Sequence, residues 1–143
     1  MFVTGAIAGF GSVIVNGVRY DTDSATVRIE DKAATPAQLK VGEVIRLKAE
    51  IDAGGVARAK SIDQDDLVQG EVQAVDLAAG TLTIAGQVIV VDNETIFDDS
   101  IPTRSLAGVS VGDRLEVHGF AGGDTARATR IEKADAGETE VEV

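Results

Sequence analysis

The chain contains two copies of one sequence pattern. Residues 11–20 read GSVIVNGVRY, and residues 80–90 read GTLTIAGQVIV. The match continues through later segments in the same order and at nearly constant spacing, which indicates an internal duplication. The further matched segments are 2–7 with 67–72, 40–49 with 110–119, and 57–63 with 126–132.

Each copy has the pattern of a series of short strands. In the first copy, Asn16 and Gly17 stand between two β-branched runs, which is the signal of a two-residue hairpin. A longer strand region is expected over residues 18–29. The segment 44–51, VIRLKAEI, alternates apolar and charged residues, so its apolar members should face the interior. These members are Ile45, Leu47, Ala49 and Ile51.

A short helical connection is expected between the third and fourth strand regions. Thr35 can cap it, Pro36 suits its first position and Gly42 can end it. Three strands, a helical turn and two strands is the order of the OB-type barrel. The predicted fold class is therefore all-β, with two tandem five-stranded OB-like Greek-key barrels and one short helical turn in each. An SH3-like barrel and a pair of small sandwiches are the alternatives.

The duplication divides the chain into residues 1–65, residues 66–133 and an acidic segment, 134–143. The last segment ends in GETEVEV, which alternates like a strand. It is read either as a strand that pairs with an exposed edge on a neighbouring molecule or as a frayed acidic terminus. Residues 2–7 match the segment that joins the copies, so both ends look like cuts through a longer series.

The charge of the chain disfavours polyanionic partners. It has 24 acidic and 13 basic residues, a formal net charge of −11, and only 3% aromatic residues. Nucleic acid binding normally needs Lys and Arg against phosphates and aromatic rings against bases. No nucleic acid partner is expected, and no apolar run reaches the roughly 18 residues of a membrane span.

The chain has no cysteine, which excludes disulfides and thiolate metal sites. This absence fits both a reducing cytoplasm and a bacterial cell envelope. No signal peptide is visible after Met1, so the protein is expected to be cytoplasmic or to have lost a leader.

Five segments together cover most of both copies. They are GFGSVIVNGVRYDTDSATV, LKVGEVIRLKA, VQGEVQAVDLAAGTLTIAGQVIVVDNETIF, VGDRLEVHGF and ATRIE. These segments resemble a bacterial family, domain of unknown function 5666 (DUF5666), which occurs in tandem copies. The resemblance implies OB-like barrels in an exported protein of the periplasm, cell surface or extracellular space, often a lipoprotein. It brings no catalytic residues.

Acidic clusters are the best candidates for a chemical site. Asp63, Asp65 and Asp66, in the sequence DQDD at the junction of the copies, are predicted as oxygen ligands of a calcium ion. A solvated acidic surface with no cofactor is the preferred interpretation, and calcium is the alternative. Further acidic clusters are DTD at 21–23, DNE at 92–94 and DD at 98–99.

Two other features are read as structural. His118, the single histidine, falls on the outward phase of its strand and is expected to be exposed. The glycine-rich segment GAIAGFG, residues 5–11, is followed by a strand pattern and not by a helix, so turns and a bulge are expected there, not a phosphate loop.

The predicted function is a non-enzymatic structural or adhesive module of the bacterial envelope or extracellular surface, which associates with further copies through strand edges. Nothing distinguishes one pair of carboxylates as a glycosidase acid and base. One alternative is a small-ligand or carbohydrate-binding module, and another is a calcium-stiffened surface repeat. A groove of the ligand-binding kind would be lined by Phe10, Tyr20, Phe97 or Phe120.

Overall fold

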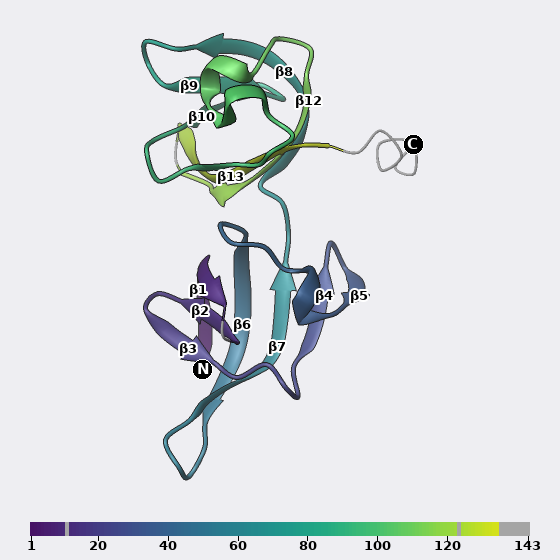
Figure 1. Cartoon of the computed structure of the whole chain (residues 1–143), viewed down its shortest axis with the longest axis vertical. Coiled ribbons are helices and arrows are strands. Elements are labelled where there is room, and N and C mark those ends of the chain that lie inside the picture. The colour runs from purple at the N-terminus through teal and green to yellow at the C-terminus, as the bar shows by residue number, and fades with distance from the viewer. Residues whose placement is uncertain (11, 123, 135–143) are drawn as a thin grey trace. The chain divides into compact units, whose positions relative to one another are not determined.

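The computed structural model describes residues 1–10, 12–122 and 124–134 (Figure 1). The chain divides into two compact units, Met1–Asp65 and Asp66–Val143. Within the described residues, every regular element is a strand or a short 3-10 turn, and each unit encloses its own apolar core. The prediction of an all-β chain with two tandem OB-like barrels is confirmed.

The first unit is a sheet in the order β3-β2-β1-β6-β7-β4-β5. The β3 end of this sheet closes onto β7: the Asp21 N–H donates to the Ala57 carbonyl at 2.9 Å, and the Ala59 N–H donates to the Asp21 carbonyl at 2.8 Å. These bonds connect the residue after β3 to β7 in parallel, as in an OB barrel. The strands are β1 Phe2–Phe10, β2 Val13–Val15, β3 Val18–Tyr20, β4 Thr26–Ile29, β5 Lys32–Ala34, β6 Val44–Ile51 and β7 Ala57–Gln64.

The local predictions for the first unit are largely confirmed. Asn16 and Gly17 connect β2 and β3 as a hairpin, and Pro36–Gln38 forms the 3-10 turn η1. Two expectations are wrong. The strand expected over residues 18–29 is interrupted, because residues 22–25 form a turn closed by the Ala25 N–H and the Thr22 carbonyl. Ile51 is 66% exposed, because it lies at the end of β6, beyond the core.

The second unit contains a closed ring of five strands, β8-β9-β10-β13-β12 and back to β8. The pairing of β10 with β13 is parallel, whereas the other four pairings are antiparallel. This is the strand order of an OB barrel. The strands are β8 Val68–Asp76, β9 Thr81–Ile84, β10 Gln87–Val90, β11 Ile96–Phe97, β12 Arg114–Phe120 and β13 Thr125–Lys133, with the 3-10 turns η2 Pro102–Arg104 and η3 Leu106–Gly108.

Aliphatic side chains fill the second barrel. Burying one such side chain contributes about 1.5–3 kcal/mol relative to leaving it in water, so this core supplies the main stabilisation of the unit. The largest fully buried apolar residues are Leu82, Ile84, Ile89, Ile101, Leu115 and Ile131.

Both barrels carry a β-bulge at the same place in the repeat. The register shifts opposite Lys48–Ala49 of β6, where Lys60 is the extra residue in β7, and opposite His118–Gly119 of β12, where Thr129 is the extra residue in β13. A third register shift lies between Ile7 and Gly9 in β1, within the glycine-rich segment, as expected of a bulge there. Bulges bend a strand and re-aim its side chains, and the bulge in β13 lies next to the single histidine of β12.

The proposed tail falls almost entirely outside the described residues. Only Ala134 of the segment 134–143 is described, and its N–H donates to the Arg114 carbonyl at 2.9 Å. No helix in the described part of the chain is long and apolar enough to cross a membrane.

Candidate functional site

His118 lies on the outer side of the second barrel, in β12. Its strand neighbour Val117 points into the core, and Arg130 of β13 is its partner across the sheet. The outward phase agrees with the sequence pattern, but the expectation that His118 is exposed is wrong. The side chain has no exposed surface, because carboxylate side chains surround the ring.

Three carboxylates contact the imidazole ring. Nδ1 lies 3.3 Å from Oδ1 of Asp66, and Nε2 lies 3.2 Å from Oε2 of Glu116 and 3.3 Å from Oε1 of Glu132. Glu116 is two residues before His118 on the same strand, and Glu132 is the partner of Glu116 across the sheet. We call Asp66, Glu116, His118 and Glu132 the histidine cluster.

Asp66 joins the histidine cluster through the pairing of β8 with β12. The N–H of Leu67 donates to the Val117 carbonyl at 2.8 Å, which extends the ladder beyond Val68. Asp66 is therefore held next to the strand that carries His118. One ligand atom each from Asp66, Glu116 and His118 lies within 4.8 Å of the others.

Arg130 extends the histidine cluster towards β11. Its Nε donates to Oε1 of Glu132 at 3.1 Å, and its Nη2 donates to Oδ1 of Asp98 at 2.8 Å. The Ser100 N–H, which donates to Oδ2 of Asp98 at 3.0 Å, holds the pKa of Asp98 below its usual value, and Arg130 adds to this effect. Arg130 is thus a fixed cation that orients Glu132 towards the ring.

The three aspartates predicted as calcium ligands have different surroundings. Asp66 belongs to the histidine cluster of the second unit. Asp63 and Asp65 belong to the first unit, where they border a small depression with Arg46, and Asp63 is the cross-strand partner of Arg46. Calcium binding by these residues stays a prediction.

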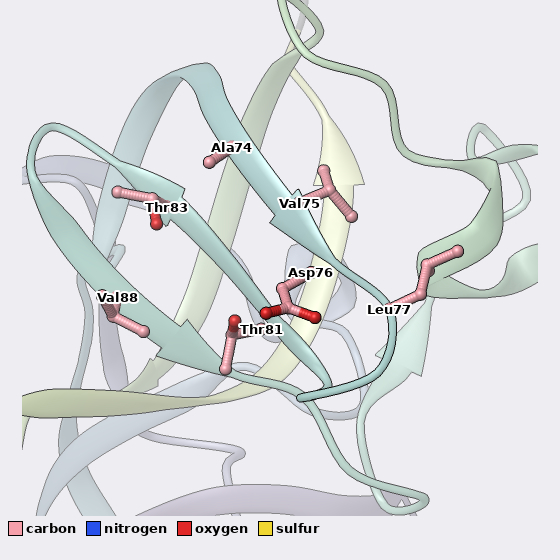
Figure 2. Close-up of a pocket in the computed structure, with 7 residues that line it drawn as sticks. All are labelled: Ala74, Val75, Asp76, Leu77, Thr81, Thr83 and Val88. Atoms are coloured by element: carbon pink, nitrogen blue, oxygen red, sulfur yellow. The ribbon is translucent and has the colours of Figure 1, made fainter.

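A shallow depression of about 590 Å³ lies on the outer side of β8, β9 and β10 (Figure 2). Thr83 pairs with Ala74 on one side and Val88 on the other, so these three side chains form a row across the sheet. Leu77, in the turn after β8, is 62% exposed. Asp76 is engaged in that turn, since its Oδ1 accepts the Ala79 N–H at 3.0 Å. The lining is therefore mainly apolar and hydroxyl groups.

The aromatic residues do not line this depression. Tyr20 is in the core of the first unit, and Phe97 packs against the core of the second. Phe10 is half exposed and borders another depression in the first unit, together with Pro36 and Leu39. Only Phe10 of the four aromatics borders a depression described here, so the predicted aromatic groove is not supported.

Charge is distributed unequally between the two units. The first unit carries 8 basic and 9 acidic residues, a net charge of −1, whereas the second carries 5 basic and 15 acidic residues, a net charge of −10, with four of the acidic residues in the segment 135–143 after the barrel. The repeat positions of Glu116 and His118 are occupied in the first unit by Arg46 and Lys48, both exposed. The outer sides of the two barrels have therefore diverged in charge at equivalent positions.

Sequence reasoning missed the histidine cluster, although part of its signal was present. Glu116 is two positions before His118, and Arg130 is two positions before Glu132. Alternate residues of a strand point to the same side, so each pair lies on one face of its strand. Pairing the two strands brings these faces together. Asp66 is distant in sequence from both strands and carried no such signal.

Comparison with known proteins identifies a family for the chain. No curated protein and no solved structure matches it. The family model described as domain of unknown function DUF5666 matches residues 2–63 and again residues 69–132. The chain therefore belongs to the DUF5666 family and carries two tandem copies of its domain.

Proposed function

We propose that the chain is a non-enzymatic structural module of the bacterial envelope or extracellular surface, which associates with further copies through the different charge of its two barrels. The observation that carries this proposal is the net charge of −1 on residues 1–65 and −6 on residues 66–133, which have 5 basic and 11 acidic residues. A heterologous contact between unlike surfaces can repeat and build an open series.

The outer side of β6 and β7 is the basic surface in this proposal. Arg46 and Lys48 of β6 and Lys60 of β7 are exposed there. Lys60 has a long contact to Glu50, with 3.6 Å between Nζ and Oε2. Arg58 is engaged by Asp21 and Asp52 within its own unit, so Arg46 and Lys48 are the residues to test.

The complementary surface is the acidic exterior of the second barrel in another molecule. Glu71, Glu94 and Asp124 are exposed on it. A single exposed ion pair contributes only about 0.2–1 kcal/mol, so association needs several pairs at once and should weaken as salt screens them.

Light scattering over a concentration series tests this association. The molar mass should rise with concentration at about 10 mM ionic strength and fall to that of the monomer at about 1 M, where the screening length drops from about 30 Å to about 3 Å. The variant Arg46→Glu/Lys48→Glu should remain monomeric. Arg19→Glu/Lys32→Glu, an equal charge change at exposed sites on other strands, should associate like the parent chain.

A strict monomer at low ionic strength rejects the proposal, as does a charge-reversed variant that still associates. A chain shortened to end at Lys133 separates the two modes of assembly. Loss of association on shortening supports strand addition by residues 134–143 over contact between charged barrel faces.

The envelope or extracellular location is supported by the resemblance to exported proteins of this family. Fractionation of cells that express the full native gene product tests it. Recovery of the protein solely with the cytoplasmic fraction would reject this part of the proposal.

A second candidate function is the binding of a small apolar ligand in the depression of Figure 2. OB barrels commonly bind ligands on this side of the sheet, and the exposed Leu77 and Val88 favour an apolar one. An apolar fluorescent dye should bind the parent chain and bind Leu77→Lys more weakly. Val111→Lys, which alters another exposed apolar residue, is the control. Equal dye binding by both variants rejects this candidate.

A further inference from the structure

The contacts of His118 place a carboxyl group at each ring nitrogen. Both ring nitrogens face carboxylate oxygens, with Asp66 at Nδ1 and both Glu116 and Glu132 at Nε2. A neutral imidazole has one N–H and one lone pair, so one nitrogen would direct its lone pair at a carboxylate. A proton shared between that nitrogen and its carboxylate relieves this repulsion, and so does a metal cation bound between them.

The histidine cluster is not a requirement of the barrel fold. In the first barrel, Lys48 pairs with Ser61 and Arg46 pairs with Asp63, whereas in the second barrel His118 pairs with Arg130 and Glu116 pairs with Glu132. The first barrel closes the same strand pair, with the same bulge, without an imidazole or a pair of opposed carboxylates. The second copy therefore carries this ligand set for a reason other than closing the sheet.

We propose that the second barrel binds a divalent transition metal ion, with zinc as the first choice, through Nδ1 of His118 and the carboxylates of Asp66 and Glu116. One ligand atom from each residue lies within 4.8 Å of the others. Oε2 of Glu116 contacts Nε2 at 3.2 Å, so the Glu116 carboxylate has to turn towards Nδ1 when the ion binds. Zinc bonds of about 2.0–2.2 Å in a tetrahedral site place neighbouring ligand atoms about 3.3–3.6 Å apart. The 3.3 Å between Nδ1 and Oδ1 of Asp66 already matches that separation.

Glu132 and Arg130 act as positioning residues for the ring. With the metal on Nδ1, the Nε2–H of His118 donates to Oε1 of Glu132, which lies 3.3 Å away. Arg130 holds the same oxygen through its Nε at 3.1 Å. A metal-bound histidine typically donates its other N–H to a carboxylate in this way, which fixes the tautomer and the ring orientation.

The donor set favours zinc over calcium. Calcium takes six to eight oxygen ligands, whereas imidazole nitrogen together with carboxylate suits zinc and related metals. Three protein ligands leave a fourth position for water. The ion would connect the segment before β8 to β12, since Asp66 precedes β8 and the other two ligands are on β12.

Calorimetric titration of the whole chain, prepared without a histidine tag, with zinc chloride tests the site. One Zn²⁺ should bind per chain, and calcium chloride should not compete at equal concentration. His118→Gln and Glu116→Gln should each bind Zn²⁺ at least about tenfold more weakly, and Glu132→Gln about 10–100-fold more weakly. Glu71→Gln, which removes an exposed carboxylate from β8, and Lys48→Gln, the first-barrel equivalent of the histidine change, are the matched controls.

The single histidine gives a second measurement that does not depend on the variants folding well. In the parent chain, Zn²⁺ should shift the ¹⁵N resonance of Nδ1 and leave Nε2 protonated. The proposal is overturned if no Zn²⁺ binds, if Zn²⁺ binds His118→Gln as well as the parent, or if both ring nitrogens stay protonated at saturating Zn²⁺. Each of these results is independent of self-association, so the two proposals fail separately.

Discussion

Glu116 and Glu132 lie directly opposite each other across β12 and β13, and Nε2 of His118 contacts both, at 3.2 Å and 3.3 Å. Like charges at opposed positions of a sheet normally destabilise it. The imidazole, together with Arg130 at Glu132, offsets that repulsion in the second barrel. Lys48 at the equivalent position of the first barrel has no such pair of acids to offset.

Replacing His118 by Gln should therefore destabilise the metal-free protein by about 1–3 kcal/mol, because largely buried carboxyl groups lose their hydrogen-bonding partner. Urea denaturation in the presence of a chelator measures this loss. Adding Glu116→Gln to the variant should recover part of the stability by removing one of the opposed charges. Lys48→Gln should stay within about 0.5 kcal/mol of the parent. An unaltered free energy of unfolding for His118→Gln would contradict the stabilising role of the ring.

Gly119→Ala should destabilise the second barrel, even though the equivalent residue of the first barrel is Ala49. A Cβ on Gly119 would lie 2.1 Å from the Arg127 carbonyl oxygen, which belongs to the backbone of β13 and cannot rotate away. We expect a loss of more than about 2 kcal/mol, as for other overpacked buried sites. The control is Gly9→Ala in β1, whose nearest contact would be an ordinary 3.6 Å. Equal thermal midpoints for the two variants would show that the bulge in β13, opposite Gly119, adapts.

The fold was predictable because its signals are local and occur twice. Alternation in 44–51 and the Asn16–Gly17 hairpin each specify a piece of sheet, and the repeated order of pieces specifies a barrel. The interruption of the expected long strand also had a local signal. In the sequence DTDS, Oδ1 of Asp21 accepts a hydrogen bond from the Asp23 N–H at 2.8 Å. This bond closes a turn of a kind that Asp commonly forms. The chain therefore turns here, although the apolar pattern on both sides predicted a continuous strand.

The histidine cluster was not predictable from any one strand. Period-2 alternation gave the outward direction of His118 correctly, yet burial of an outward residue depends on what neighbouring segments place over it. Here Glu132 comes from the paired strand and Asp66 from the segment before β8. Adjacency in sequence had grouped Asp66 with Asp63 and Asp65, whereas strand pairing groups it with His118.

The two hairpin turns allow a reciprocal test. Asn16 has φ of 52° and Ala85, its counterpart in the second barrel, has φ of 54°, and each precedes a glycine with positive φ. Asn tolerates this conformation better than Ala. Ala85→Asn should stabilise the chain by about 0.5–1 kcal/mol, and Asn16→Ala should destabilise it by at least as much, since Nδ2 of Asn16 also donates to the Thr4 carbonyl. Chemical denaturation checks both, and changes of the same sign would contradict the argument.

Acid should weaken both barrels through two aspartates. Hydrogen bonds from the Val56 N–H and then from Arg58 lower the pKa of Asp52, and the Ser100 N–H lowers the pKa of Asp98. A carboxyl whose pKa is lower in the folded state stabilises the fold above its unfolded pKa, about 3.9, and loses that contribution as the pH falls through the folded value. The free energy of unfolding should therefore be nearly constant from about pH 7 to pH 5 and should fall below about pH 4.

Asp52→Asn and Asp98→Asn separate this effect from general acid sensitivity. Each variant should be less stable than the parent near neutral pH and should approach it once the pH has fallen through the lowered pKa of the folded parent, because the parent then also lacks the carboxylate. Asp31→Asn, which removes an exposed carboxylate, is the charge-matched control. Urea denaturation at successive pH values gives the comparison. If the two variants and the control keep a constant difference from the parent at every pH, these hydrogen bonds do not account for the acid dependence.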